Sequence, residues 1–144
     1  MAEPPLSWWG ISQYASGTIH AAIGRDRSRR NRMSTKTKEG RDAVTRYKVV
    51  KEFTTSYGKF ALLDVTIETG RTHQIRVHLK AIGHPVVGDL TYGSGSVIRG
   101  IALPRQFLHA SQLHFHHPIT DEPLAFEAPL PVDLQSVLDQ KNFL

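Results

Sequence analysis

Alternating side chains in two neighbouring stretches, residues 43–53 and 59–69, constrain the fold of this chain most strongly. A short polar turn that ends in Gly58 separates the two stretches, so the pattern predicts an antiparallel hairpin. In the second stretch one face carries Ala61, Leu63, Val65 and Ile67. The opposite face carries Phe60, Leu62, Asp64, Thr66 and Glu68. Because the opposite face becomes more polar along the strand, we expect the first face to line the core.

The period of the pattern then changes over residues 72–85. An apolar stripe recurs at helical spacing, at Ile75, Leu79 and Ile82. This spacing predicts a helix with Thr72 as its N-cap, and Gly83 and Pro85 are expected to end it. At about 100° per residue, Arg76 falls on the flank of the stripe, where it can lie at the edge of a cleft.

The remaining segments are shorter and are expected to complete one domain. Residues 86–96 form a glycine-rich loop, 105–118 and 121–131 have strand patterns, and 132–144 resembles a helix. We find no repeat and no linker, so residues 1–144 are interpreted as a single α+β unit with a mixed, mainly antiparallel sheet and flanking helices. Residues 1–10 contain two prolines and no periodicity, which indicates an irregular arm. Trp8 and Trp9 within it are interpreted as packing residues rather than a base-stacking platform.

The overall composition indicates a polyanionic partner. Lys and Arg number 18 against 13 Asp and Glu, which gives a net charge of +5. Nucleic acid is the favoured partner, and an acidic membrane surface is the weaker alternative. The absence of cysteine excludes disulfides and thiolate metal sites and is compatible with a reducing cytoplasm. No apolar run approaches the roughly 20 residues of a membrane span, so we expect a soluble cytoplasmic chain.

Residues 24–41, here called the basic segment, concentrate the positive charge. Seven basic side chains stand in it: Arg25, Arg27, Arg29, Arg30, Arg32, Lys36 and Lys38. Apolar residues are almost absent, which predicts a surface loop outside the core. Charges of one sign at this density repel one another unless an anion neutralises them, so we interpret the segment as phosphate-binding. A solvated charged loop is the alternative.

Histidines and glycines suggest other sites that the spacing does not support. Four histidines are grouped late in the chain: His109, His114, His116 and His117. Strand alternation places His116 and His117 on opposite faces, and His73 and His78 are five residues apart without an HExxH motif. We therefore expect no metal site. The sequence also lacks the GxSxG, GxGxxG and GxxxxGK[ST] motifs, which argues against hydrolase, dinucleotide and P-loop sites.

Several unusual residues stand together in ETGRTHQIRVHLKAIGHPVVGDLTYG at 68–93. RQFLHASQLHFHHPITDEPLAFEAPLP follows at 105–131, and SGTIHAAIGRDRSRRNRM and AVTRYKVVKEF precede it. These segments resemble RNA pseudouridine synthases of the RluA type, from the C-terminal part of their catalytic domain. The resemblance covers most of the chain, and the GRTHQIRVHL block is its most specific part.

The resemblance implies isomerisation of uridine to pseudouridine in structured RNA, with ribosomal RNA as the leading substrate. In this family an aspartate in a motif like HRLD attacks the uridine, and no cofactor or metal takes part. The resemblance makes Arg76 the partner of that aspartate and places Leu108 in the packing of the active site. Arg71, His73 and His109 are then expected to contact RNA. The full-length form is expected to be a monomer.

The sequence also departs from this family. It contains no HRLD motif, and the position of the family's YLALVxG tyrosine falls near Pro4. Its aspartates all stand in other contexts: Asp26, Asp42, Asp64, Asp89, Asp121, Asp133 and Asp139. We therefore expect a partial catalytic domain that is inactive alone, in which Arg76 lacks its aspartate. The alternative is a non-catalytic RNA-binding module derived from the same fold.

Overall fold

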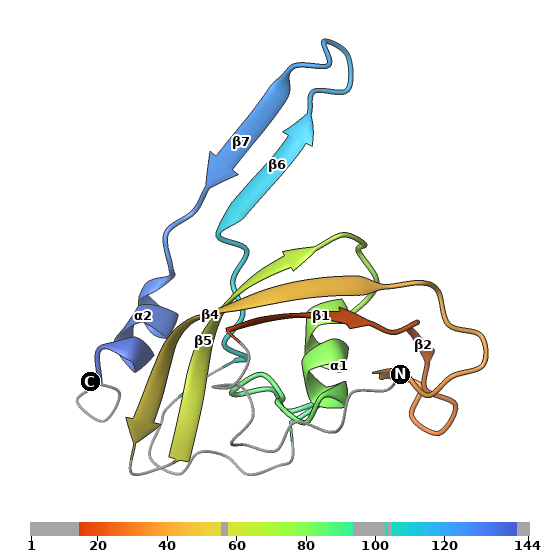
Figure 1. Cartoon of the computed structure of the whole chain (residues 1–144), viewed down its shortest axis with the longest axis horizontal. Coiled ribbons are helices and arrows are strands. Elements are labelled where there is room, and N and C mark those ends of the chain that lie inside the picture. The colour runs from red at the N-terminus through yellow and green to blue at the C-terminus, as the bar shows by residue number, and fades with distance from the viewer. Residues whose placement is uncertain (1–14, 56–57, 94–102, 104, 141–144) are drawn as a thin grey trace.

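A three-stranded antiparallel sheet forms the centre of the protein (Figure 1). The structure, a computed structural model, describes residues 15–55, 58–93, 103 and 105–140. Strands β1 (Ser16–His20), β4 (Val44–Thr55) and β5 (Gly58–Ile67) lie in the order β1-β4-β5. The hairpin predicted from the alternating pattern is therefore confirmed, with a register shift between Val49 and Lys51.

The basic segment contains a small hairpin of its own. Strands β2 (Gly24–Arg25) and β3 (Met33–Ser34) pair antiparallel, and Ile23 pairs with Arg41 where the segment returns to the sheet. Met33 packs against buried Ile23, so the prediction of a loop wholly outside the core was wrong. Met33 also donates its backbone N–H to the hydroxyl of Tyr92, so packing and a hydrogen bond both hold the hairpin on the domain.

Helix α1 (Gln74–Ala81) packs beside the sheet, as Figure 1 shows. Its apolar stripe meets the sheet in one cluster, which comprises Ile19, Tyr47, Leu79, Leu63, Val65, Ile75, Ile82 and Val86. The predicted helix is confirmed, but Thr72 is not its N-cap. The N-cap is His73, in the left-handed conformation at φ 56°, and it makes no capping hydrogen bond through its side chain. The backbone N–H of Arg71 instead donates to Oε1 of Gln74, which holds the turn from inside the helix.

The assignment of one core face to β5 was only partly right. Leu63 and Val65 do pack toward α1, but Ile67 at the end of that face is 46% exposed. On the other face, Phe60 and Leu62 pack in a cluster with buried Val137 of α2 (Val132–Leu138). Both faces of the hairpin are therefore apolar near its turn, because the C-terminal helix covers the second one.

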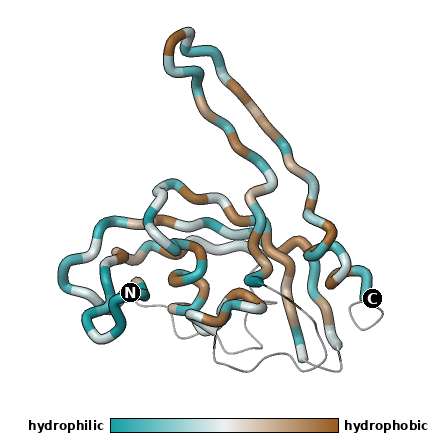
Figure 2. The backbone as a smooth tube through the Cα atoms, turned by 180° about the vertical axis from the view of Figure 1, so that it is seen from behind, coloured by the Kyte–Doolittle hydropathy of each residue, from teal (hydrophilic) through white to brown (hydrophobic). Residues whose placement is uncertain are grey.

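The last two strands form a separate hairpin that projects from the domain in both views (Figures 1 and 2). Strands β6 (Gln112–His116) and β7 (Pro123–Glu127) pair antiparallel, and Phe115 stacks on Phe126 with ring centroids 5.8 Å apart. Leu113 and Phe126 are more than half exposed. The mixed, mainly antiparallel α+β class is confirmed. Within the described residues, no helix has the length and apolar character needed to cross a membrane.

Candidate active site around helix α1

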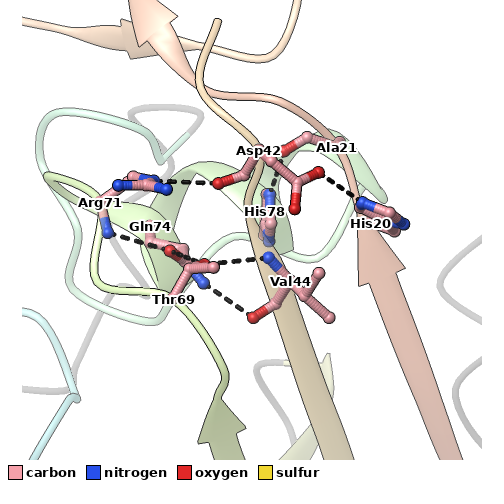
Figure 3. Close-up of polar contacts among 8 residues, drawn as sticks. All are labelled: His20, Ala21, Asp42, Val44, Thr69, Arg71, Gln74 and His78. Atoms are coloured by element: carbon pink, nitrogen blue, oxygen red, sulfur yellow. Dashed lines mark hydrogen bonds and ion pairs between the residues drawn. The ribbon is translucent and has the colours of Figure 1, made fainter.

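A buried glutamine ties the start of α1 to the sheet (Figure 3). Nε2 of Gln74 donates to the carbonyl oxygen of Val44 at 2.9 Å and to Oγ1 of Thr45 at 3.0 Å. Its Oε1 accepts from Oγ1 of Thr69 at 2.7 Å and from the backbone N–H of Arg71 at 3.0 Å. Every donor and acceptor atom of this amide is thus engaged, which fixes the backbone that carries the HQIR residues.

A second buried side chain, His78, anchors the next turn of the helix. Its Nε2 lies 2.8 Å from the carbonyl oxygen of Ala21, and its Nδ1 lies 2.8 Å from Oγ1 of Thr45. A carbonyl oxygen only accepts, so Nε2 carries the proton and Nδ1 accepts from the threonine hydroxyl. Burial lowers the pKa of His78, in agreement with a neutral ring. His78 is therefore a structural residue of α1.

Arg76, one turn into the helix, forms a bidentate ion pair with Asp89. Its Nε donates to Oδ2 of Asp89 at 2.7 Å and its Nη2 donates to Oδ1 at 2.9 Å. Oδ1 also accepts the backbone N–H groups of Thr91 and Tyr92. The side chain of Asp89 is 0% exposed and that of Arg76 is 13% exposed, so water screens this pair little. Asp89 is thus a carboxylate partner of Arg76 that the sequence did not indicate, whereas the pairing of Arg76 with the family's catalytic aspartate stays a prediction.

Tyr92 lies beside this ion pair and joins α1 to the basic segment. Its hydroxyl accepts the backbone N–H of Met33 at 2.8 Å and lies 2.8 Å from Nδ1 of His73. The guanidinium carbons of Arg32 and Arg76 lie 5.1 and 5.0 Å from the centroid of its ring. Tyr92 is 1% exposed, so these contacts replace solvent around the phenol.

The charges in this region are set by the ion pair and by burial. Burial would raise the pKa of Asp89, but hydrogen bonds from Arg76, Tyr92 and Thr91 outweigh it and lower the pKa. The hydrogen bond to Asp89 raises the pKa of Arg76. Burial and the charge of Arg76 lower the pKa of His73. The site therefore combines an ionised pair with a neutral imidazole.

The other basic side chains of the basic segment lie mostly on the surface. Oδ1 of Asp26 accepts the backbone N–H groups of Ser28 and Arg29 and so fixes the turn between β2 and β3. An open hollow of about 360 Å³ beside this turn is lined by Arg25, Asp26, Arg27, Ser28, Ser34, Lys36, Thr37 and Lys38. The structure thus separates Arg32, which reaches Tyr92, from the other basic residues of the segment.

Three other residues predicted from the sequence to belong to the site, Arg71, His109 and Leu108, have their polar contacts elsewhere. Nε of Arg71 donates to the carbonyl oxygen of Asp42 at 2.9 Å, at the edge shown in Figure 3. His109 lies near the base of the projecting hairpin, where its Nε2 is 3.0 Å from the carbonyl oxygen of Ala128. Leu108 is half-buried, and its carbonyl oxygen accepts from Nη1 of Arg105. No hydrogen bond or ion pair joins Leu108 or His109 to Arg76 within the described residues. Trp8 and Trp9 lie outside them.

No three histidine, aspartate or glutamate side chains gather as metal ligands anywhere in the described part of the chain. His114 and His116 stand on exposed β6. The guanidinium groups of Arg32 and Arg76 give the site around α1 donors that suit anions.

Sequence reasoning missed Asp89 and Tyr92, both of which lie in the segment that was interpreted as a glycine-rich loop. Gly88 has φ 76°, and a side chain there would meet the carbonyl oxygen of Arg105 at 2.5 Å, so the turn before Asp89 requires glycine. An aspartate that follows such a glycine and precedes further turn residues commonly accepts backbone N–H groups. That signal was present in GDLTYG, although the pairing with Arg76 was not visible from it.

Comparisons with known proteins agree with these features. A family model described as RNA pseudouridylate synthase matches residues 9–81. A protein of Chlorobaculum parvum, named as an uncharacterized RNA pseudouridine synthase, is 43% identical over 149 residues, which cover 92% of this chain and 44% of the relative. Ribosomal large subunit pseudouridine synthase D of Nitrosomonas europaea is 46% identical, over a stretch that covers 85% of this chain and 36% of the length of that relative.

The solved structure of human RNA Pseudouridylate Synthase Domain Containing 1 superposes with a TM-score of 0.71 and 32% identity, over 87% of this chain and 53% of that one. The chain spans less than half the length of the curated relatives described above. The family model nevertheless matches just over half of it, through β1, the basic segment, the central hairpin and α1. The chain therefore belongs to the RNA pseudouridylate synthase family.

Proposed function

We propose that this chain forms the arginine-bearing part of an RNA pseudouridine synthase centre of the RluA type, which isomerises uridine in structured RNA. The observation that carries the proposal is the fixed guanidinium of Arg76. Asp89 occupies its Nε and Nη2, while Nη1 makes no hydrogen bond to any described residue. The N–H groups of Nη1 and the second one of Nη2 form a fork that matches a further carboxylate.

A guanidinium at this place supports the chemistry that the family resemblance implies. The nucleophile there is an aspartate, which must be ionised to attack the uridine so that the base can detach, turn and rejoin through carbon. An adjacent arginine favours the ionised carboxylate and fixes its direction. We propose that residues outside this sequence supply that aspartate, because the 144 residues contain no HRLD motif. No cofactor or metal is needed for this step.

The basic segment supports RNA as the substrate. Its turn is fixed by Asp26, and its hollow is lined by four basic side chains, Arg25, Arg27, Lys36 and Lys38. Phosphates of a structured RNA fit such a surface. Arg29, Arg30, Arg71, His73 and His109 are proposed as further RNA contacts, and Leu108 as a packing residue of the active site. The Nitrosomonas relative is named for the ribosomal large subunit, and we propose ribosomal RNA as the substrate. We propose a cytoplasmic location, in keeping with the absence of cysteine, and a monomeric full-length form.

The test is an assay of uridine-to-pseudouridine conversion in bulk ribosomal RNA. The 144-residue chain is compared with the same chain extended upstream to include any HRLD-like segment, in each case with and without Arg76→Lys. We expect conversion only by the extended chain, and a loss of at least about 100-fold with Arg76→Lys because lysine cannot form the fork. Arg46→Lys, at an exposed ion pair, serves as the matched control. Salt-sensitive RNA binding without conversion by any form would instead identify the non-catalytic RNA-binding module.

A further inference from the structure

Arg32 differs from the other arginines of the basic segment in its surroundings. Arg25, Arg27, Arg29 and Arg30 are exposed, whereas Arg32 is half-buried with its guanidinium carbon 5.1 Å from the centroid of the Tyr92 ring. Its backbone is fixed on both sides. Its N–H donates to the carbonyl oxygen of Arg29 at 2.9 Å, and its carbonyl oxygen accepts the N–H of Asp26 at 3.0 Å. Arg32 is therefore held toward the site by the fold.

The Nε atom of Arg32 is buried and has no hydrogen-bond partner among the described residues. No carboxylate forms an ion pair with Arg32 in that part of the chain either. Arg76, on the same tyrosine ring, is in contrast neutralised by Asp89. A buried N–H of a charged group that lacks an acceptor is unfavourable, and a bound acceptor relieves it. Arg32 thus has no ion-pair partner among the described residues, and a bound anion would accept its Nε–H.

The neighbouring imidazole contributes a neutral donor to the same place. The hydroxyl of Tyr92 already accepts from Met33, so its own proton is free to be donated to Nδ1 of His73, 2.8 Å away. His73 then carries its proton on Nε2, which makes no hydrogen bond to any described residue. The lowered pKa of His73 agrees with a neutral ring. Asp89 neutralises Arg76 and His73 is neutral, so Arg32 supplies the remaining positive charge at the Tyr92 ring, where it also acts electrostatically on Asp26.

We propose that Arg32 and His73, placed by Tyr92 beside Arg76, bind the phosphodiester next to the uridine that reacts. This inference rests on the proposed function and divides the basic segment into two parts. The exposed arginines and lysines attract the RNA backbone as point charges, whereas Arg32 binds one phosphate through its planar fork. The guanidinium groups of Arg32 and Arg76 both contact the Tyr92 ring, which keeps the proposed phosphate site close to Arg76.

The test measures the affinity of the 144-residue chain for a short uridine-containing RNA hairpin, at several salt concentrations. Arg32→Lys keeps the charge and removes the fork, and Arg29→Lys makes the same change at an exposed position of the same turn. We expect Arg32→Lys to lose about tenfold in affinity and Arg29→Lys less than about threefold. Equal losses from the two variants would overturn the inference and leave RNA binding by the basic segment intact.

A second measurement guards against misfolding of Arg32→Lys. In the wild-type chain, the Nε–H resonance of Arg32 is followed by NMR while the RNA hairpin is added. We expect it to shift together with that of Arg76. A titration that moves the amides of the Arg25–Arg27 turn but leaves the Nε–H of Arg32 in place would refute the phosphate site. If the wild-type chain binds no RNA in either measurement, the proposed function fails and this inference fails with it.

Discussion

Replacing Asp89 with asparagine tests the ion pair at the centre of the site. The carboxylate accepts two hydrogen bonds from Arg76 and two from backbone N–H groups, and its side chain is 0% exposed. In Asp89→Asn, one oxygen can still accept the backbone donors, but the amide nitrogen then faces the guanidinium, which remains buried without a counterion. Removing one partner of a buried pair costs about 3–5 kcal/mol. For a chain of this size, the melting temperature should fall by about 10 °C.

Urea unfolding followed by circular dichroism measures this change in the free energy of unfolding. The control is Glu68→Ala, which breaks the exposed ion pair with Arg46 and should cost less than about 1 kcal/mol. The double variant Arg76→Met/Asp89→Asn removes both charges, keeps an amide oxygen that accepts the N–H groups of Thr91 and Tyr92, and is expected to recover most of the lost stability. A cost of Asp89→Asn below about 1 kcal/mol, or a double variant as unstable as Asp89→Asn, would refute the description of this pair as buried and mutually dependent.

Two further predictions concern the residues that anchor α1. Burial lowers the pKa of His78 from its ordinary value of 6.5. As the pH falls, His78 is therefore protonated in the unfolded chain before it is protonated in the folded chain. The contribution of this group to the free energy of unfolding is therefore fully present above about pH 7. It falls as the pH drops through 6.5, by up to about 1.4 kcal/mol per pH unit. Thermal melts at pH 7.5 and 5.5 should show a smaller change of melting temperature with pH in His78→Gln than in the wild-type chain. Gln74→Ala removes a fully bonded buried amide and should cost at least about 2 kcal/mol in urea unfolding, whereas Gln112→Ala, at an exposed position, should cost less than about 0.5 kcal/mol. Equal costs for the two glutamine variants would contradict the role given to Gln74.

Local patterns in the sequence were sufficient to predict the strands and helices, but not to predict which elements pack against one another. Alternation over 43–53 and 59–69 predicted the hairpin, and the helical spacing of apolar residues over 72–85 predicted α1, because both patterns depend on neighbouring residues. The burial of Phe60 and Leu62 could not, because the helix that covers them begins at Val132. A strand pattern shows that two faces differ, but it does not identify what packs on each face.

The site was predictable to the extent that it depends on a motif. Arg76 was identified from the HQIR segment, but its pairing with Asp89 depends on the turn at Gly88 and on the direction of both side chains. The position of Arg32 was missed for a similar reason, because it depends on the contact with Tyr92, whose hydroxyl also accepts the N–H of Met33. Contacts that join distant segments are set by tertiary packing, which residue type alone does not reveal.

At His73, the left-handed backbone favours glycine for stability, whereas the proposed function needs the imidazole ring. A residue other than glycine with φ 56° is unfavourable, by roughly 1 kcal/mol or more, so glycine would suit the backbone here better. Glycine would also remove the ring that meets the Tyr92 hydroxyl. A selection for thermal stability alone would therefore tend to replace His73, whereas a selection for the reaction would retain it. This residue would distinguish a working enzyme from a descendant that keeps only the fold.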